Sequence, residues 1–470
     1  MSEARTAGRR RLAVLNVVGL TDSVLAQMPW TREWVETTQG VEVRSFRPAF
    51  PAVTCTAQST YLTGLPVGEH GIVGNGWYDR TEAEVKFWKQ SNHWVEGEKL
   101  WERMGGRCAQ MFWWYNMYAQ VDFSATPRPL YPADGRKVFD IHTQPMEMRE
   151  EMKKDLGEFP FPAFWGPRAG IESSKWIAAS AKWIEEREQP ELNLVYLPHL
   201  DYGLQKYGPG AVEMEAEYGA IDAVVRGLIS FFEDHGVEVV LLSEYGISRV
   251  DQPVHLNRMF REKGWIQVKD ELGRETLDCG GCRAFAVADH QVAHIYLNDL
   301  SIADEVRQVV QETEGVAEIR QGAELWAAGG KGRERGGDFV AVAEAGAWFT
   351  YYFWEDDEKA PDYARCIDIH RKPGYDPVEL FLDPELKVPA FKIGAFLAKK
   401  KLGLRGLLDV IPLDASLVKG SHGRDVVPTS EQPVVVGEGA KAVTSAEDVF
   451  EWLRKKLEPT EGLPGATSSS

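Results

Sequence analysis

The chain is short of cysteine, of long apolar runs and of positive charge. Its 470 residues include five cysteines, an odd number that does not suggest a disulfide scaffold, and the pair Cys279 and Cys282 lacks the second CxxC that would complete a zinc site. No apolar run approaches the length of a membrane span. With 53 lysines and arginines against 71 aspartates and glutamates, the formal net charge is −18, which argues against a nucleic-acid polymer as partner.

The N-terminal region has the basic and apolar parts of a secretory signal peptide but not its cleavage site. Three arginines at residues 9–11 precede the apolar run LAVLNVVGL, but no small-residue cleavage site follows at the right distance. We interpret the apolar run as a first buried strand. Together with cysteines interpreted as reduced thiols, this predicts a cytoplasmic protein.

The rest of the composition is that of a folded globular protein. It is 44% hydrophobic and 26% charged, enough for one large domain with insertions or for two domains. Helical spacing over residues 172–188 precedes the strand-like run LNLVYL, and a second helical stretch over 212–234 precedes VEVVLLS. This alternation predicts an α/β fold with a mainly parallel central sheet.

Beyond residue 247 the pattern changes. Helical segments alternate with β-like runs, which predicts an inserted α/β cap over residues 251–364. The core would then comprise residues 1–250 and 365–460. The ending EPTEGLPGATSSS predicts a disordered tail over residues 461–470.

The most distinctive stretch is PAFPAVTCTAQSTYLTGLPVGEHGIVGNGWYDR, residues 48–80. Helix-compatible residues run from Thr54 to Thr63 and are followed by a glycine-rich loop. A helix opening at Thr54 would set its hydroxyl against unpaired N–H groups, where negative charge is favoured. That position suits a hydroxyl that attacks phosphate, and the alternative is an ordinary N-cap threonine.

Two further groups of residues carry chemistry. Asp289, His290 and His294 form one cluster; on a strand His290 and His294 would share a face and could bind metal or phosphate, or they could be ordinary core or surface residues. Asp368 and His370, two apart, share a face if the chain is extended there. With the adjacent cations Arg371 and Lys372 they form either a site or a surface ion-pair network.

The run VTCTAQSTYLTGLPVGEHGIVGN resembles the nucleophile segment of the nucleotide pyrophosphatase/phosphodiesterase branch of the alkaline phosphatase superfamily. Pieces of the resemblance recur as far as about His422. It implies an alkaline-phosphatase-like three-layer sandwich. It also implies that Thr54 attacks phosphorus and that Asn75, in the glycine-rich loop, holds a phosphate oxygen.

The same resemblance implies metal ligands. Asp201 matches the family's aspartate that precedes a histidine by four residues, and Gln205 stands at the histidine position. In SEYG, where the family has Ser-Asp-His-Gly, Glu244 keeps a carboxylate and Tyr245 replaces the imidazole. In GSHG, His422 matches the last metal-binding histidine.

One ligand of the family has no counterpart in the first strand. Val18 stands where the family has a metal-binding aspartate, and Asn16 or Asp22 could substitute for it. The resemblance thus implies one or two divalent ions, zinc, manganese or magnesium, held by Asp201, Gln205, Glu244 and His422. Other possible replacements for the lost ligands are Asp289, His290, His294, Asp368 and His370.

The implied function is metal-dependent hydrolysis of a small-molecule phosphate ester, a phosphodiester, pyrophosphate or monoester, through a phosphothreonine intermediate. Two alternatives stay open: a catalytically decayed protein that binds a ligand or acts as a scaffold, and a site rebuilt for a sulfate or phosphonate ester. No C-x-P-x-R motif supports a sulfatase. Aromatic residues crowd residues 77–170, mostly as core, and a minority could receive a flat or apolar leaving group. The sequence does not specify the substrate or the oligomeric state.

Overall fold

A computed structural model of the chain describes residues 10–134, 136–326, 330–404 and 406–458. Its centre is an eight-stranded sheet. Along the sheet the order is β2 (Glu42–Ser45), β20 (Val434–Gly437), β9 (Glu238–Leu242), β1 (Leu12–Val17), β8 (Leu192–Leu197), β5 (Cys108–Met111), β6 (Phe123–Pro127) and β7 (Ile141–Gln144).

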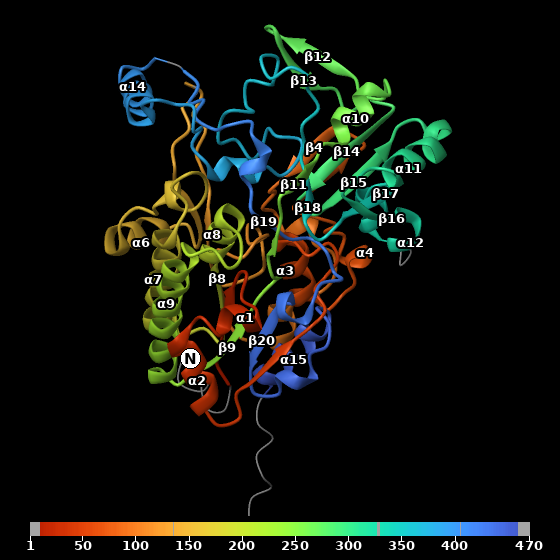
Figure 1. Cartoon of the computed structure of the whole chain (residues 1–470). Coiled ribbons are helices and arrows are strands. Elements are labelled where there is room, and N and C mark those ends of the chain that lie inside the picture. Colours follow the sequence, from red (N-terminus) through yellow and green to blue (C-terminus); the bar gives the residue numbers. More distant parts are fainter. Residues whose placement is uncertain (1–9, 135, 327–329, 405, 459–470) are drawn as a thin grey trace, which may run out of the picture.

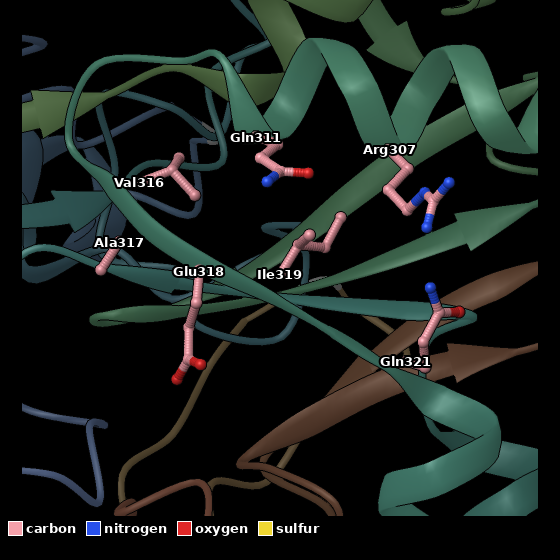
Figure 2. Close-up of a pocket in the computed structure, with 7 residues that line it drawn as sticks. All are labelled: Arg307, Gln311, Val316, Ala317, Glu318, Ile319 and Gln321. Carbon is pink, nitrogen blue, oxygen red and sulfur yellow. The ribbon is translucent and has the colours of Figure 1, made fainter.

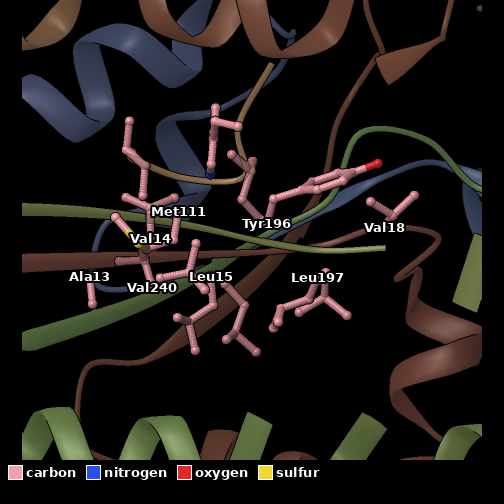
Figure 3. Close-up of a cluster of buried hydrophobic side chains, with 14 of the residues drawn as sticks. Ala13, Val14, Leu15, Val18, Met111, Tyr196, Leu197 and Val240 are labelled. Atoms are coloured by element: carbon pink, nitrogen blue, oxygen red, sulfur yellow. The ribbon is translucent and has the colours of Figure 1, made fainter. Parts of the chain in front are cut away.

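The middle of this sheet is parallel and its edges are antiparallel. β9, β1, β8, β5 and β6 run in one direction, whereas β20, β2 and β7 complete the edges in antiparallel pairings. Every residue of β1 and β8 is buried, as expected for parallel strands covered on both faces. Figure 3 shows the apolar side chains that pack around these strands, including Val14, Leu197 and Val240. The expected first buried strand and mainly parallel central sheet are confirmed.

Helices cover both faces of the sheet, which makes a three-layer sandwich (Figure 1). On one side α7 packs against α9, which also contacts α2 and α8, and on the other side α15 packs against α3 and α5. The core helices are α1 (Asp22–Leu25), α2 (Pro29–Thr37), α3 (Thr54–Thr63), α4 (Val67–His70), α5 (Leu100–Met104), α6 (Met148–Leu156), α7 (Ile171–Glu188), α8 (His199–Tyr207), α9 (Met214–Asp234) and α15 (Asp448–Leu457). The short α4 lies inside the stretch expected to be a loop.

A smaller antiparallel sheet forms the cap. Its strand order is β14 (Ala284–Asp289), β15 (Val292–Leu297), β17 (Phe339–Ala343) and β16 (Val316–Gln321). Around it lie β10 (Ser248–Arg249), β11 (Gln252–Val254), β12 (Val268–Glu271), β13 (Arg274–Leu277), β18 (Ala347–Phe349), α10 (Leu256–Glu262), α11 (Ala303–Gln311), α12 (Gly322–Leu325) and α13 (Lys331–Arg335). The hairpin β3 (Gly76–Asp79) and β4 (Glu84–Phe87), the helix α14 (Pro389–Lys401) and the strand β19 (Gly420–Ser421) complete the described strands and α-helices.

The two sheets follow the expected division of the chain. All strands of the central sheet lie within residues 1–250 and 365–460, and all strands of the cap sheet lie within residues 251–364. The domain boundaries themselves stay a prediction, and the expected tail over residues 461–470 lies outside the described residues. In the described part of the chain, none of the helices combines the length and the apolar character needed to cross a membrane.

Candidate active site

Thr54 is the first residue of a buried helix. α3 begins directly after Val53, whose backbone is extended (φ −134°), and it ends at Thr63. Because the first turn of a helix leaves N–H groups without helical partners, the Thr54 hydroxyl lies where negative charge is stabilised. The residue is 3% exposed, and its Oγ1 lies 3.1 Å from the hydroxyl oxygen of Tyr245. The predicted helix opening at Thr54 is confirmed.

Hydrogen bonds of the Tyr245 hydroxyl connect Asp201 to Thr54. Asp201 lies in the first turn of α8, directly after β8, and Tyr245 follows the end of β9. The Tyr245 hydroxyl donates to Asp201 Oδ1 over 3.2 Å. Because a hydroxyl has a single hydrogen, the Tyr245 oxygen is then left to accept from the Thr54 hydroxyl. The carboxyl ends of two parallel strands and the start of α3 thus meet in one hydrogen-bonded chain.

Gln205 forms a hydrogen bond with the second carboxylate oxygen of Asp201. One turn after Asp201 on α8, it donates from Nε2 to Asp201 Oδ2 over 2.8 Å. Its Oε1 accepts from the Tyr375 hydroxyl over 2.9 Å. A tyrosine hydroxyl both donates and accepts, so Tyr375 is compatible with either orientation of the Gln205 amide.

His422 lies beside this network with one nitrogen unpartnered. It follows β19, and Lys419, the residue directly before that strand, donates its backbone N–H to the Gln205 carbonyl of α8. His422 Nδ1 lies 2.7 Å from the carbonyl oxygen of Ala52, and because a carbonyl only accepts, Nδ1 carries the hydrogen. Nε2 therefore presents a lone pair, is buried without a hydrogen-bond partner among the described residues, and lies 3.8 Å from Asp201 Oδ1.

Aromatic rings hold this imidazole in place. The Tyr245 ring stacks on His422 with 3.5 Å between centroids and 6° between planes. His290 lies against His422 at 3.7 Å and stacks on Tyr375 at 3.6 Å. Four rings from four segments of the chain thus form a continuous stack at the rim of the sheet.

Glu244 is held by two amides. Asn16 Nδ2 and Gln58 Nε2 each lie 2.6 Å from its Oε1. Gln58 Oε1 accepts from the backbone N–H of Trp114 over 2.8 Å, which fixes the orientation of that amide. The second oxygen of Glu244 is buried without a partner within the described chain. At the position of the family's missing aspartate, Val18 is fully buried and apolar.

Asn75 joins the glycine-rich loop to the cap. Its Oδ1 accepts from Cys55 N over 3.0 Å, and its backbone N–H and Nδ2 donate to the two oxygens of Asp289 over 2.8 and 3.1 Å. Asp289 also lies 2.8 Å from His290 Nδ1. Asp289 and His290 stand at the tip of the β14–β15 hairpin, where His290 has a positive φ of 64°. The cap hairpin therefore contributes directly to the rim of the sheet.

Burial sets the protonation of these groups. It raises the pKa of Asp201 to about 7, of Glu244 to about 8 and of Asp289 to about 6, although hydrogen bonds to each carboxylate act in the opposite direction. Burial also lowers the pKa of His422 and His290 well below the ordinary histidine value. At neutral pH both imidazoles are neutral, and Asp201 and Glu244 stand near the balance between their charged and uncharged forms.

The other residues singled out in the sequence make contacts of their own. His294 is satisfied by the carbonyl of Val73 at 2.9 Å and the N–H of Gly337 at 3.1 Å. Asp368 donates its backbone N–H to Glu379, and His370 Nδ1 lies 3.4 Å from the carbonyl oxygen of Phe87. Neither Asp368 nor His370 joins the hydrogen-bonded chain around Thr54.

Sequence reasoning missed three contributors to the site. Gln58 stands four residues after Thr54, and that helical spacing could have indicated a shared face. The bridging hydroxyl of Tyr245 and the support from Tyr375 had no such signal, because their partners are 191 and 170 residues away in the chain.

The described structure has pockets at two different places. One, of about 250 Å³, lies on the cap between α11 and β16 and contains none of the predicted site residues (Figure 2). The other is a narrow crevice with no volume open to water, and Tyr245, His422 and Gln291 are among its lining residues. Neither Thr54 nor Asp201 lines either of these two pockets.

The sequence matches a known protein family and several of its members. Residues 12–376 match the family model described as type I phosphodiesterase/nucleotide pyrophosphatase. A pyrophosphatase/phosphodiesterase of Schizosaccharomyces pombe is 25% identical over 266 residues, which is 54% of this chain and 47% of that protein. Human ectonucleotide pyrophosphatase/phosphodiesterase family member 1 is 21% identical over 243 residues, which is 49% of this chain and 22% of that protein. The matches therefore span less than half the length of these curated relatives.

Solved structures share the fold. Murine ectonucleotide pyrophosphatase/phosphodiesterase 5, an inactive variant in complex with AMP, is similar with a TM-score of 0.56 and 16% identity over 97% of both chains. Phosphonoacetate hydrolase from Sinorhizobium meliloti, in complex with phosphonoformate, is similar with a TM-score of 0.57 and 14% identity over 96% of both chains. The expected alkaline-phosphatase-like α/β fold is confirmed. From the match over residues 12–376, the chain belongs to the type I phosphodiesterase/nucleotide pyrophosphatase family.

Proposed function

We propose that this chain hydrolyses phosphate esters, with Thr54 as the nucleophile. The observation that carries the proposal is the chain of hydrogen bonds from Thr54 Oγ1 to the Tyr245 hydroxyl and on to Asp201, at the N-terminus of α3. An attacking oxygen there gains from the positive end of the helix dipole as negative charge develops. Family membership supports the same reaction class.

The reaction would proceed in two displacements. In the first, Thr54 Oγ1 forms a bond to phosphorus and the bond to the leaving oxygen breaks. The threonine proton passes to the Tyr245 oxygen while the tyrosine proton passes to Asp201 Oδ1. Asn75 has a second amide hydrogen beside the one given to Asp289, and it would donate to a non-bridging oxygen. In the second displacement water attacks the phosphothreonine, which releases the phosphoryl product and regenerates the hydroxyl.

The side chains fit one divalent cation better than two. Asp201 and the lone pair of His422 Nε2 face each other over 3.8 Å, and rotation of the Gln205 amide would add an oxygen. Within the described residues no group of three His, Cys, Asp or Glu side chains could hold a metal by itself, so this third oxygen matters. A cation held there would supply positive charge that stabilises the charged oxygens of the ester.

The second metal position of the family is different in this chain. Val18 and the neutral phenol of Tyr245 provide no ligand of the family's type, and burial raises the pKa of Tyr245 well above its usual value. Glu244 receives amide hydrogen bonds on Oε1, and its Oε2 remains as a further oxygen donor. We propose zinc, manganese or magnesium as the ion at Asp201 and His422, with Gln205 and Glu244 as secondary oxygen donors.

The surroundings favour a small phosphate ester with a flat or apolar leaving group. Three half-buried tryptophans lie around Tyr375: Trp88 at 6.2 Å and Trp165 at 5.7 Å from its ring, with Trp114 at 4.9 Å from Trp88. Such faces stack on planar groups. The AMP bound by the murine neighbour is a ligand of that kind. A cytoplasmic location, which accords with five free thiols, belongs to the same proposal.

The test is hydrolysis of p-nitrophenyl phosphate and bis(p-nitrophenyl) phosphate by the full chain, with elemental analysis of the purified protein. We expect Thr54→Ala to abolish activity and Thr54→Ser to retain part of it. Thr63→Ala is the matched control, because that threonine ends the same helix and, among the residues the structure describes, its hydroxyl bonds to the Ser59 carbonyl and the Leu65 N–H alone. Mass spectrometry of quenched enzyme should find phosphate on Thr54. Full activity of Thr54→Ala would refute the nucleophile, and ligand binding without turnover would favour the scaffold alternative.

A further inference from the structure

One segment of this acidic chain is both basic and apolar. From Leu386 to Leu408 the sequence reads LKVPAFKIGAFLAKKKLGLRGLL, with five lysines, one arginine and no aspartate or glutamate. The whole chain has a formal net charge of −18, so this segment stands apart from its surroundings in charge. Large apolar residues accompany the cations along its whole length. A segment of this composition is typical of a surface that meets a membrane.

Within the segment, α14 projects from the body at the upper left of Figure 1. One side of the helix anchors it: Ile393 is half-buried and packs, with Leu386 and Leu408, against the apolar cluster that contains Tyr351 and Trp354. Lys392 Nζ adds an ion pair with Asp409 at 2.9 Å. The orientation of the helix on the protein is thus fixed by the packing of its inner side.

The outer side of α14 is apolar and exposed. Phe391, Ala395, Ala398 and Leu402 follow one another at helical spacing along a single face, and all four are exposed. Phe391 and Leu402 each expose 76% of their surface. This segment gathers six large exposed apolar residues: Val388, Phe391, Leu397, Leu402, Leu404 and Leu407. A contiguous exposed patch of this kind marks an interaction surface.

Lysines border the apolar face on both sides. At 100° per residue Lys399 falls on one edge of the stripe and Lys401 on the other, and both are exposed. In the described part of the chain neither of these two lysines has an acidic partner, in contrast to Lys392. An apolar stripe between two rows of cations matches a bilayer surface, where acyl chains meet anionic headgroups.

We propose that α14 docks this protein on a membrane surface that contains anionic lipids and lies parallel to that surface. A helix of 13 residues is about 20 Å long, shorter than the hydrocarbon core it would have to cross, so it would lie on the bilayer. A second copy of this acidic chain could offer charge to the lysines, but the apolar stripe would need an apolar partner as well. The lipid surface offers both. This proposal does not depend on the reaction proposed for Thr54.

The test is co-sedimentation of the full chain with vesicles of phosphatidylcholine alone and of phosphatidylcholine mixed with phosphatidylglycerol. We expect binding to the mixed vesicles only, weakened by salt. Lys399→Gln with Lys401→Gln should lower the binding about 25-fold, from about fivefold for each cation near an anionic surface. Phe391→Ser with Leu402→Ser should lower it about tenfold or more, since the stripe would no longer enter the interface.

Matched controls come from exposed positions elsewhere. Val212→Ser removes an apolar side chain that is 72% exposed, and Lys263→Gln removes an exposed cation after α10. Both should bind vesicles as the unmodified chain does, and all variants should melt at the same temperature, because the changed side chains are exposed. Absence of binding to mixed vesicles, or equal loss in the control variants, would overturn the proposal. A fall in solution molecular mass in the Phe391→Ser, Leu402→Ser variant without any vesicle binding would instead assign the stripe to self-association.

Discussion

Replacing Tyr245 by phenylalanine would remove one hydroxyl from the middle of the candidate site. That hydroxyl is buried, lies 3.1 Å from Thr54 Oγ1 and donates to Asp201 Oδ1 over 3.2 Å. A hydrogen bond between neutral groups contributes about 1 kcal/mol, and one to a charged group about 1.5–3 kcal/mol. Because the pKa of Asp201 is raised to about 7, its carboxylate is partly charged at neutral pH. We expect Tyr245→Phe to lower the free energy of unfolding by about 2–3 kcal/mol.

The chain offers a matched control in Tyr352. Its hydroxyl is also buried but has no hydrogen-bond partner among the described residues, so Tyr352→Phe should leave the stability unchanged or raise it. Urea unfolding followed by tryptophan fluorescence and by circular dichroism would measure both variants at pH 7. Equal shifts in the two variants would refute the reasoning, because the bonded and the unbonded hydroxyl would then contribute alike.

Three other changes test separate features of the structure. Burial lowers the pKa of His70 to about 3, so as the pH drops below 6.5 the unfolded chain binds a proton that the folded chain does not, and stability falls. Between pH 6.5 and 5 this difference lowers the free energy of unfolding by about 2 kcal/mol. His70→Asn should abolish that loss, as measured by urea unfolding at each pH. Lys372→Met should destabilise by about 3–5 kcal/mol, because it leaves the buried carboxylates of Asp376 and Glu379, each 2.7 Å from the lysine, without their cation. Gln205→His should raise the zinc retained after dialysis, measured by elemental analysis, since imidazole would replace an amide that contacts Asp201; unchanged metal content would contradict the proposed ion position.

The backbone of the site could be predicted from the sequence because it rests on local patterns. The apolar runs that became β1, β8 and β9 are fully or almost fully buried, and period and composition mark such strands. Residues that follow parallel strands meet at the same edge of the sheet, which is why Asp201 was expected there. The start of α3 at Thr54 likewise depends on a few neighbouring residues.

The side-chain connections could not be predicted in this way. Asn75 bonds to Asp289 across 214 residues, and the contact exists only because the β14–β15 hairpin of the cap turns its tip towards the glycine-rich loop. Nothing local in the sequence encodes that approach. The same holds for Tyr245, where replacement of the family's histidine implies a lost ligand, whereas the structure gives its hydroxyl two partners. A substitution at a ligand position therefore predicts the loss of a metal ligand, whereas the hydrogen bonds that the new side chain makes are known only from the structure.

The electrostatics of the site follow from these replacements. Asp201, Glu244 and Asp289 are buried, and within the described residues none of them pairs with a lysine or an arginine. Amides, hydroxyls and neutral imidazoles surround them instead, which satisfies hydrogen bonds but does not compensate for burial of charge. Burial consequently raises all three pKa values to between about 6 and 8. Positive charge brought to this rim would favour the ionised carboxylates, so a bound cation and the loss of protons from Asp201 and Glu244 would be coupled.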